Sequence, residues 1–310
     1  MRVIFLGSAD FGLPALNYLH ERHTLAAVVS TPPRPSGRGL KMADSPVVLH
    51  MKKFRHIPVL TPESLHERDF IATLRSFCAD CFIVAAFRLL PRQLFSLPPF
   101  GTLNIHASLL PAFRGPAPIH RAIEAGEKRT GITVFRIDEG IDTGEILMQE
   151  TMDIGEEETT PQLYERLSAR GAAVLEKTLA ALEKGICVPQ LQDGTRSSKA
   201  PKLRKIESII DWSLPSEVLF NKIKAFKPFP GTVTFTDTGR LGIEWGYPIR
   251  SDDAAASCGT IVEINDDGFD VQTGHGLLRV ISVKPEGRKI MTAGDFIRGS
   301  VIRKGHRFHE

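Results

Sequence analysis

The 310-residue sequence predicts an α/β domain built on a parallel sheet, followed by a small β-barrel domain. Short apolar segments alternate with amphipathic stretches through the first half of the chain. A polar, basic stretch interrupted by proline comes next, and beyond it the pattern changes to short strands separated by turns. These three observations place a first domain over residues 1–188, a linker over 189–205 and a second domain over 206–310.

The first domain is expected to contain a Rossmann-like parallel sheet. Its apolar segments cover residues 2–6, 25–30, 82–86, 103–105 and 132–137, and a long helix is expected over 161–185. The turn after the first strand has Gly7 and Gly12 at its ends, but it lacks the middle glycine through which a dinucleotide-binding backbone approaches pyrophosphate. Nicotinamide binding is therefore not expected, and Asp10 is assigned a structural role as the cap of the next helix.

Asn104 and His106 stand two positions apart at the carboxyl end of an expected strand, where open α/β sheets bind their ligands. Side chains two apart on a strand point to the same side, so the amide and the imidazole would share one cleft. With the carboxylate of Asp142, the set offers a donor to a developing oxyanion, a proton carrier, and an anion that orients or charges the imidazole. This combination suits acyl transfer to an amine without a Ser or Cys nucleophile.

The segment over 108–119 supports the catalytic interpretation, which an isolated Asn-x-His pair would not carry because such pairs are more often structural. The segment reads Ser-Leu-Leu-Pro-Ala-Phe-Arg-Gly-Pro-Ala-Pro-Ile, and it is too long and too poor in charge for a plain surface connection. Its apolar, proline and glycine residues predict the wall of a pocket beside Asn104 and His106.

Taken in order, these motifs resemble those of the folate-dependent formyltransferases. The landmarks in the first two thirds of the chain are Phe5-Leu6-Gly7 with Asp10-Phe11, residues 34–39, Asn104-Ile105-His106, residues 108–111, and Asp142-Thr143-Gly144. Residues 200–203, 210–212, 225–231 and 284–287 resemble the C-terminal half of the members that act on initiator tRNA. The resemblance implies transfer of a formyl group from 10-formyltetrahydrofolate to the amino group of methionine on initiator methionyl-tRNA, for translation initiation.

The resemblance also implies roles for individual residues. Asn104 is expected to donate a hydrogen bond to the oxyanion, His106 to pass a proton or to stabilise the oxyanion as a cation, and Asp142 to set the charge of the imidazole. The residues expected to bind the folate co-substrate are Ser108, Leu109, Leu110, Pro111, Phe87, Arg88 and Leu90. No metal ion is expected at the site.

Arg88 is a departure from the family pattern, which usually has a Tyr-Gly pair where this chain has Phe87-Arg88. Glycine permits positive φ and close ligand approach, whereas arginine must keep a commoner backbone geometry or be strained. The departure bears on folate affinity. One hypothesis is that the guanidinium contacts the glutamate tail of the folate, because arginine pairs well with carboxylates.

Cationic residues are expected to contact the tRNA backbone. The loop over 31–44 is rich in glycine, proline and cations, and composition alone would make it a solvated surface loop. The resemblance instead implies that it approaches the acceptor stem, where phosphate contacts supply affinity rather than base identity. The residues assigned to tRNA binding are Arg34, Arg38, Lys41, Lys202 and Lys289.

The second domain is expected to be an OB-like β-barrel. Its predicted strands cover residues 232–235, 241–245, 259–264, 268–273 and 277–283. Residues 196–310 contain 18 Lys and Arg against 14 Asp and Glu, a net charge of +4, whereas residues 1–195 contain 21 against 22. A basic barrel can hold a tRNA backbone, although such a modest excess is also common on surfaces without a nucleic-acid partner.

Four cysteines in a chain of this length predict no disulfide framework and favour a reducing, cytoplasmic location. Cys78 and Cys81 form a Cys-x-x-Cys pattern, but no second Cys or Cys-His pair stands at zinc-ligand spacing, and a buried strand follows directly. Neither a secretory signal nor a membrane-spanning stretch is expected. We expect a monomer that has no membrane partner.

Two other functions are compatible with parts of these patterns. A formyltransferase acting on an amino-sugar nucleotide, or a hydrolase of formyl folate, would share the first domain, but the motifs and charge of the second half favour tRNA. A folate- or RNA-binding protein without catalysis would tolerate Arg88, but the intact set of Asn104, His106 and Asp142 argues against it.

Overall fold

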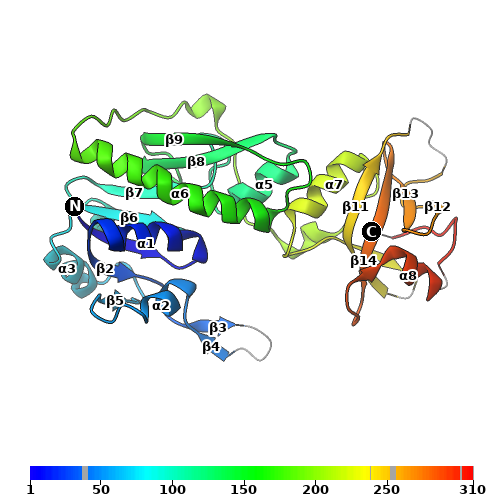
Figure 1. Ribbon diagram of the computed structural model, residues 1–310, viewed down its shortest axis with the longest axis horizontal. Helices are drawn as coiled ribbons and strands as arrows, with labels where there is room; N and C mark the ends of the chain where they lie inside the picture. Colours follow the sequence, from blue (N-terminus) through cyan, green and yellow to red (C-terminus); the bar gives the residue numbers. More distant parts are fainter. Residues whose placement is uncertain (37–40, 238, 252–255, 301, 310) are drawn as a thin grey trace. The chain divides into compact units, whose positions relative to one another are not determined.

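The computed structural model describes residues 1–36, 41–237, 239–251, 256–300 and 302–309. The chain divides into two compact units, whose elements are labelled in Figure 1. The first unit comprises residues 1–118, 129–153 and 164–200, and the second comprises residues 119–128, 154–163 and 201–310. Each unit has its own sheet and its own hydrophobic core.

The first unit is built on a seven-stranded sheet with the strand order β5-β2-β1-β6-β7-β8-β9. The strands are β1 Arg2–Gly7, β2 Thr24–Val29, β5 Val59–Leu60, β6 Cys81–Ala85, β7 Thr102–His106, β8 Arg129–Arg136 and β9 Ile146–Asp153. The five neighbouring strands β5, β2, β1, β6 and β7 run parallel, which confirms the Rossmann-like prediction. However, β8 and β9 run antiparallel to their neighbours, so the expectation that residues 132–137 extend the parallel set is wrong.

The direction of β8 follows from the path of the chain before it. For β8 to run parallel to β7, the connection would have to cross over and return the chain to the amino end of β7. Instead, His106 at the carboxyl end of β7 pairs with Thr133, and Leu103 pairs with Arg136. The chain therefore re-enters the sheet at the same end of β7 from which it left. The long apolar segment after His106 therefore stays beside the end of its own strand.

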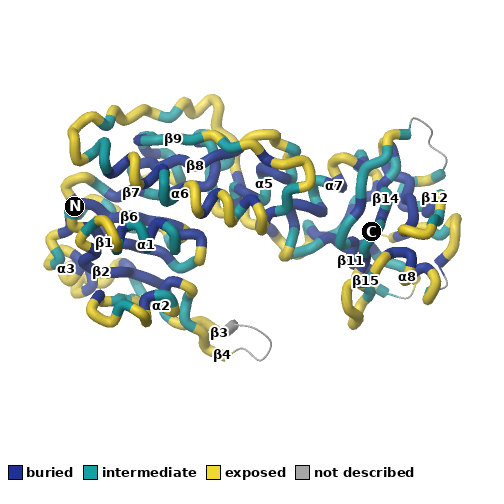
Figure 2. Tube along the Cα trace, in the orientation of Figure 1, coloured by how far each residue is buried: buried dark blue, intermediate teal, exposed yellow. Residues whose placement is uncertain are grey.

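The inner strands of this sheet are almost completely buried, as the dark blue trace in Figure 2 shows. The helices of the first unit are α1 Leu13–Arg22, α2 Pro46–Met51, α3 Arg68–Ser76, α4 Arg92–Phe95, and residues 164–183 of α6 Thr160–Glu183, which confirms the predicted long helix. Gly171 of α6 packs on β7, where a Cβ atom would lie 3.0 Å from Ile105. Parallel strands covered on both faces are continuous apolar runs, which is why the sequence revealed them.

Asp10 lies in the turn between β1 and α1, in the short 3-10 helix η1 Asp10–Gly12. No side chain caps either η1 or α1, so the prediction that Asp10 caps the helix is wrong. Instead, the hydroxyl of Tyr164 donates to Oδ1 of Asp10 at 2.5 Å and accepts a hydrogen bond from the amide of Phe11 at 2.9 Å. Burial, together with the neighbouring carboxylate, raises the pKa of Tyr164, so the hydroxyl stays protonated as a donor.

The second unit contains an antiparallel sheet with the strand order β10-β11-β14-β13-β12, and β15 pairs with β14. Its strands are β10 Val233–Thr236, β11 Gly239–Ile249, β12 Ile261–Ile264, β13 Phe269–Gln272, β14 Leu277–Pro285 and β15 Met291–Thr292. Its helices are residues 119–124 of α5 Pro118–Glu124, residues 160–163 of α6, the short η3 Lys205–Ser208, α7 Ser216–Ala225 and α8 Ala293–Arg298. All five strands that the sequence predicted for this region are present.

The C-terminal residues join the two edges of this sheet. His309 forms a bridge with Phe235 of β10, and Arg307 forms a bridge with Thr260, next to β12. Phe308, between them, is 3% exposed and stacks on the indole of Trp212 with ring centroids 5.7 Å apart. The sheet thereby curls around one core, in agreement with the predicted barrel.

The described cysteines form no disulfide. Cys81 is buried in β6, and burial raises the pKa of its thiol to about 12, so no thiolate forms at neutral pH. In the described part of the chain, no helix is long and apolar enough to cross a membrane. Within the same residues, no group of three His, Cys, Asp or Glu side chains is arranged to hold a metal ion.

The closure of the barrel leads to a stability prediction. Replacing Phe308 with Ala should lower the free energy of unfolding of the second unit by about 3–5 kcal/mol, because a large cavity would remain beside Trp212. The matched control is His309→Ala, since His309 is the next residue along and its side chain is 59% exposed. Denaturant unfolding followed by Trp fluorescence would measure both variants. Equal losses in the two would contradict the proposed closure.

Candidate active site

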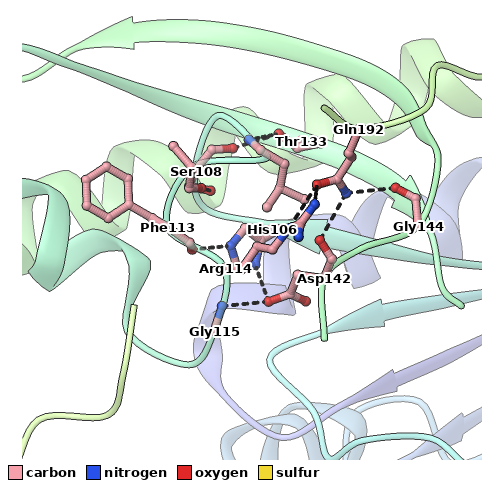
Figure 3. A network of polar contacts seen from close by, with 11 residues as sticks. His106, Ser108, Phe113, Arg114, Gly115, Thr133, Asp142, Gly144 and Gln192 are labelled. Atoms are coloured by element: carbon pink, nitrogen blue, oxygen red, sulfur yellow. Dashed lines mark hydrogen bonds and ion pairs between the residues drawn. The ribbon is translucent and has the colours of Figure 1, made fainter. Parts of the chain in front are cut away.

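His106 is the last residue of β7, and only 7% of its side chain is exposed. Its Nε2 atom lies 3.0 Å from the carbonyl oxygen of Phe113, and its Nδ1 atom lies 3.7 Å from Oδ2 of Asp142 (Figure 3). A carbonyl oxygen only accepts hydrogen bonds, so Nε2 carries a proton. Nδ1 then faces the carboxylate of Asp142. The structure thus brings together the predicted His106 and Asp142.

Asn104 lies two residues before His106 on β7, so strand alternation points both side chains to the same face of the sheet. The residue is half-buried. Among the residues that the structure describes, none hydrogen-bonds to its side-chain amide. An Asn amide can donate two hydrogen bonds, so this one is available to an oxygen atom of a ligand.

The carboxylate of Asp142 is aimed by an unusual backbone conformation. Asp142 has a φ of 54°, in the left-handed region, which costs a non-glycine residue about 1–3 kcal/mol. Its Oδ2 atom accepts a hydrogen bond of 2.8 Å from the amide of Gly115 while it faces His106. Two positions on, a Cβ atom at Gly144 would overlap the carbonyl oxygen of Arg136, so the turn has room only for glycine there.

Residues 108–111, the first part of the segment expected to form a pocket wall, are held by hydrogen bonds to the antiparallel strands. The hydroxyl of Thr133 on β8 donates to the carbonyl of Ser108 at 2.7 Å and accepts from the amide of Leu110 at 3.1 Å. Gln149 on β9 donates to the carbonyl of Leu110 at 2.9 Å. In this segment Ser108 and Leu110 are buried, whereas Leu109 and Pro111 are partly exposed. Residues at the site edge are thus fixed before any ligand binds.

Phe87, Arg88 and Leu90 follow β6. Phe87 and Leu90 are partly buried against the core of the first unit. The two terminal nitrogens of Arg88 donate to backbone carbonyls, Nη1 to Glu63 at 3.0 Å and Nη2 to Pro62 at 2.9 Å. Burial lowers the pKa of Arg88. The guanidinium therefore already has partners within the chain, which the glutamate-tail hypothesis did not anticipate.

Arg88 causes no backbone strain in this turn. The left-handed residue is Ala86, with a φ of 49°, and Arg88 is not among the residues with positive φ. The turn therefore takes its unusual conformation two residues before the position where the family usually has glycine. This explains how the chain accommodates a large side chain there.

The expected tRNA loop folds in part into a hairpin. Strand β3 Arg34–Ser36 pairs antiparallel with β4 Lys41–Ala43. The side chains of Arg34 and Lys41 are exposed. Arg38 lies outside the described residues.

The remaining cations assigned to tRNA binding lie in the second unit. Lys202 and Lys289 are exposed, and the side chain of neither forms a hydrogen bond or ion pair with another described residue. Lys222 and Lys224 of α7 instead donate to backbone carbonyls of the second unit, and burial lowers their pKa values. Those two lysines stabilise the unit itself.

Sequence reasoning missed three residues that shape this site. Phe113 supplies the carbonyl that accepts from His106, the hydroxyl of Ser198 accepts a hydrogen bond from the amide of Phe113 at 2.9 Å, and Gln192 donates to the turn around Asp142. Ser198 and Gln192 belong to the stretch 189–205, whose composition is typical of a linker. No local pattern in the sequence could have identified Ser198 and Gln192, because their contacts span 85 and 50 positions along the chain.

Comparison with known sequences identifies the class of protein. The sequence profile described as "Formyl transferase" matches residues 1–179, and the one described as "Formyl transferase, C-terminal domain" matches residues 202–301. The chain therefore belongs to the formyl transferase family, a family that uses folate. This confirms the resemblance indicated by the motifs around Asn104 and His106.

Within this family the chain belongs with the methionyl-tRNA formyltransferases. The methionyl-tRNA formyltransferase of Heliobacterium modesticaldum is 40% identical, in an alignment that covers 99% of this chain and all of the relative. That of Roseobacter denitrificans is also 40% identical, with 99% of each chain covered. Such similarity extends over both units.

A solved structure shares the fold. It is the N-formyltransferase from Helicobacter canadensis in complex with folinic acid and dTDP-3-aminofucose, with a TM-score of 0.64, 19% identity, and coverage of 90% of this chain and 99% of that chain. At this identity the likeness shows a common fold and does not choose between acceptor substrates.

Proposed function

We propose that this protein transfers the formyl group of 10-formyltetrahydrofolate to the amino group of methionine on initiator methionyl-tRNA. The similarity to methionyl-tRNA formyltransferases over nearly the whole chain carries the proposal. The set of Asn104, His106 and Asp142 supports it, since these side chains supply the groups that the reaction needs. We also propose the cytoplasm as the location and a monomer as the active form.

The reaction requires no covalent intermediate on the protein. The free amine attacks the formyl carbon, and the carbonyl oxygen becomes an oxyanion. The amide of Asn104 donates a hydrogen bond to that oxygen. The bond between the formyl carbon and the folate nitrogen then breaks, while the proton lost by the attacking amine reaches the leaving nitrogen. His106, charged and oriented by Asp142, is the group proposed to carry this proton or to stabilise the oxyanion as a cation.

The residues assigned to each substrate from the sequence are proposed to contact it. We propose that residues 108–111, together with Phe87, Arg88 and Leu90, contact the folate. The cations assigned to tRNA, which are Arg34, Arg38, Lys41, Lys202 and Lys289, would pair with phosphates. Cations that contact phosphates supply affinity and salt dependence, so the choice of initiator tRNA must come from other features.

A direct assay tests the proposed function. The purified protein would be mixed with 10-formyltetrahydrofolate and one of three acceptors: methionyl initiator tRNA, the same tRNA with a paired acceptor end, or an amino-sugar nucleotide. We expect formyl transfer to the natural initiator tRNA alone. Formylation of the sugar nucleotide would reassign the substrate, and binding of folate or tRNA without any product would indicate a protein that does not catalyse the reaction.

His106→Ala and Asp142→Asn should each lower kcat by about 10²–10⁴-fold, because each removes one member of the proton-carrying pair. Both variants should keep the fold, as judged by unchanged unfolding temperature within a few degrees. Asp153→Asn is the matched control, since the side chain of Asp153 on β9 is 83% exposed and its carboxylate pairs only with exposed Arg129 among the described residues. A near-normal rate in either active-site variant would refute the assigned roles.

Replacing Arg88 with Met should weaken the binding of folate and of pteroate, which lacks the glutamate tail, by the same factor. The physical reason is that Arg88 holds the backbone at Pro62 and Glu63, so its loss would loosen one wall of the site. Calorimetric titration would measure both ligands, with Arg92→Met as control, because Arg92 is an exposed arginine four residues further along, in α4. Weaker binding of folate alone would instead support contact with the glutamate tail.

Alanine at Arg34, Lys41, Lys202 or Lys289 should raise the KM for tRNA several-fold and leave kcat nearly unchanged. Each phosphate contact that is lost should also reduce the slope of log affinity against log salt concentration by about one. Arg55→Ala is the control, because Arg55 is an exposed cation that has not been assigned to tRNA. The same salt slope in wild type and all four variants would show that these cations do not contact phosphate.

A further inference from the structure

The stretch over 190–200, whose composition is that of a linker, lies against the catalytic site. Gln190 forms an antiparallel bridge with Ile146 at the start of β9. Further along, the hydroxyl of Ser198 accepts a hydrogen bond from the amide of Phe113. Between these points, the side chain of Gln192 reaches the turn that carries Asp142, as Figure 3 shows.

The side-chain amide of Gln192 is completely used. Its Nε2 atom donates to the carbonyl oxygens of Asp142 at 3.0 Å and Gly144 at 2.8 Å. Its Oε1 atom accepts from Nε and Nη2 of Arg114 at 3.1 and 2.7 Å. A guanidinium only donates and a carbonyl only accepts, so the orientation of the amide is determined by its partners.

This arrangement requires glutamine chemically. A glutamate side chain of the same shape would keep the acceptors for Arg114, but it would turn a carboxylate oxygen toward two carbonyl oxygens. A lysine or arginine would donate to the carbonyls and repel Arg114. Only a side-chain amide of this length supplies the two donors and the acceptor at once.

The turn that Gln192 holds is the one that most needs support. Asp142 has a left-handed backbone, and such a residue persists only where its surroundings determine its conformation. The two carbonyls that Gln192 binds stand on Asp142 itself and two residues beyond it. If the turn relaxed, Oδ2 of Asp142 would move away from Nδ1 of His106.

We infer that Gln192 is a positioning residue of the active site, which holds the Asp142 turn so that the carboxylate faces His106. In this role Gln192 acts through Asp142. The inference rests on the proposed function where it concerns the reaction rate, but the support of the turn is a property of the fold and can be measured without catalysis.

The test compares Gln192→Glu with the matched control Gln190→Glu, which makes the same change at an exposed side chain two positions away. In the formyl-transfer assay, Gln192→Glu should lower kcat about 10²-fold and leave the KM of both substrates within about twofold, because a displaced catalytic group slows the chemical step. Gln190→Glu should match the wild type. In an Asp142→Asn background, Gln192→Glu should change kcat by less than about twofold, because the carboxylate that Gln192 positions is already absent.

Amide hydrogen exchange across residues 141–145 gives a second readout. It should be faster in Gln192→Glu than in wild type and unchanged in Gln190→Glu. Wild-type exchange in Gln192→Glu would overturn the inference, and so would a wild-type kcat or an undiminished effect in the Asp142→Asn background. If the wild-type protein formylated none of the acceptors, the proposed function would fail, while the exchange data would still decide whether Gln192 holds the turn.

Discussion

The site depends on the two contacts that fix the imidazole of His106. Its Nε2 atom donates to the carbonyl of Phe113, and its Nδ1 atom faces the carboxylate of Asp142. The hydrogen bond at Nε2 orients the ring, and the carboxylate, 3.7 Å from Nδ1, acts on the other nitrogen through its charge. Both partners, moreover, are residues with left-handed backbones, so the two contacts exist only because the surrounding chain forces those conformations.

The antiparallel end of the sheet provides much of that constraint. Because β8 returns beside the carboxyl end of β7, the side chain of Thr133 can hold the backbone of residues 108–111 on both sides of Leu109. If β8 had been parallel to β7, the connection would have carried the chain to the amino end of β7, and residues 108–111 would have lacked this support. The departure from a purely parallel sheet is therefore part of how the site is built.

The features predicted correctly from the sequence have local signals. Buried parallel strands such as β1 and β6 are continuous apolar runs, and the period of a strand places Asn104 and His106 on one face. The barrel strands were predicted because turn residues separate them. In each case the signal comes from the same residues that form the element.

The features that were missed or predicted wrongly depend on partners far along the chain. Asp10 was predicted to cap a helix, but Tyr164, 154 positions away, binds its carboxylate. The direction of β8 depends on the path of the preceding connection rather than on its own residues. Gln192 and Ser198 lie in a stretch of linker-like composition, and only the folded chain shows what they contact.

The separations along the chain at this site also have a consequence for the order of folding. Gln192 meets Asp142 across 50 positions, and Ser198 meets Phe113 across 85. Closing such long loops costs conformational entropy, and a few hydrogen bonds offset less of that cost than the buried apolar strands of the sheet do, so these contacts should form after the sheet. A newly made chain would therefore pass through a stage in which the sheet is formed while the turn of Asp142 is not yet held beside the imidazole. Catalytic competence would then mark the last step in the maturation of the first unit.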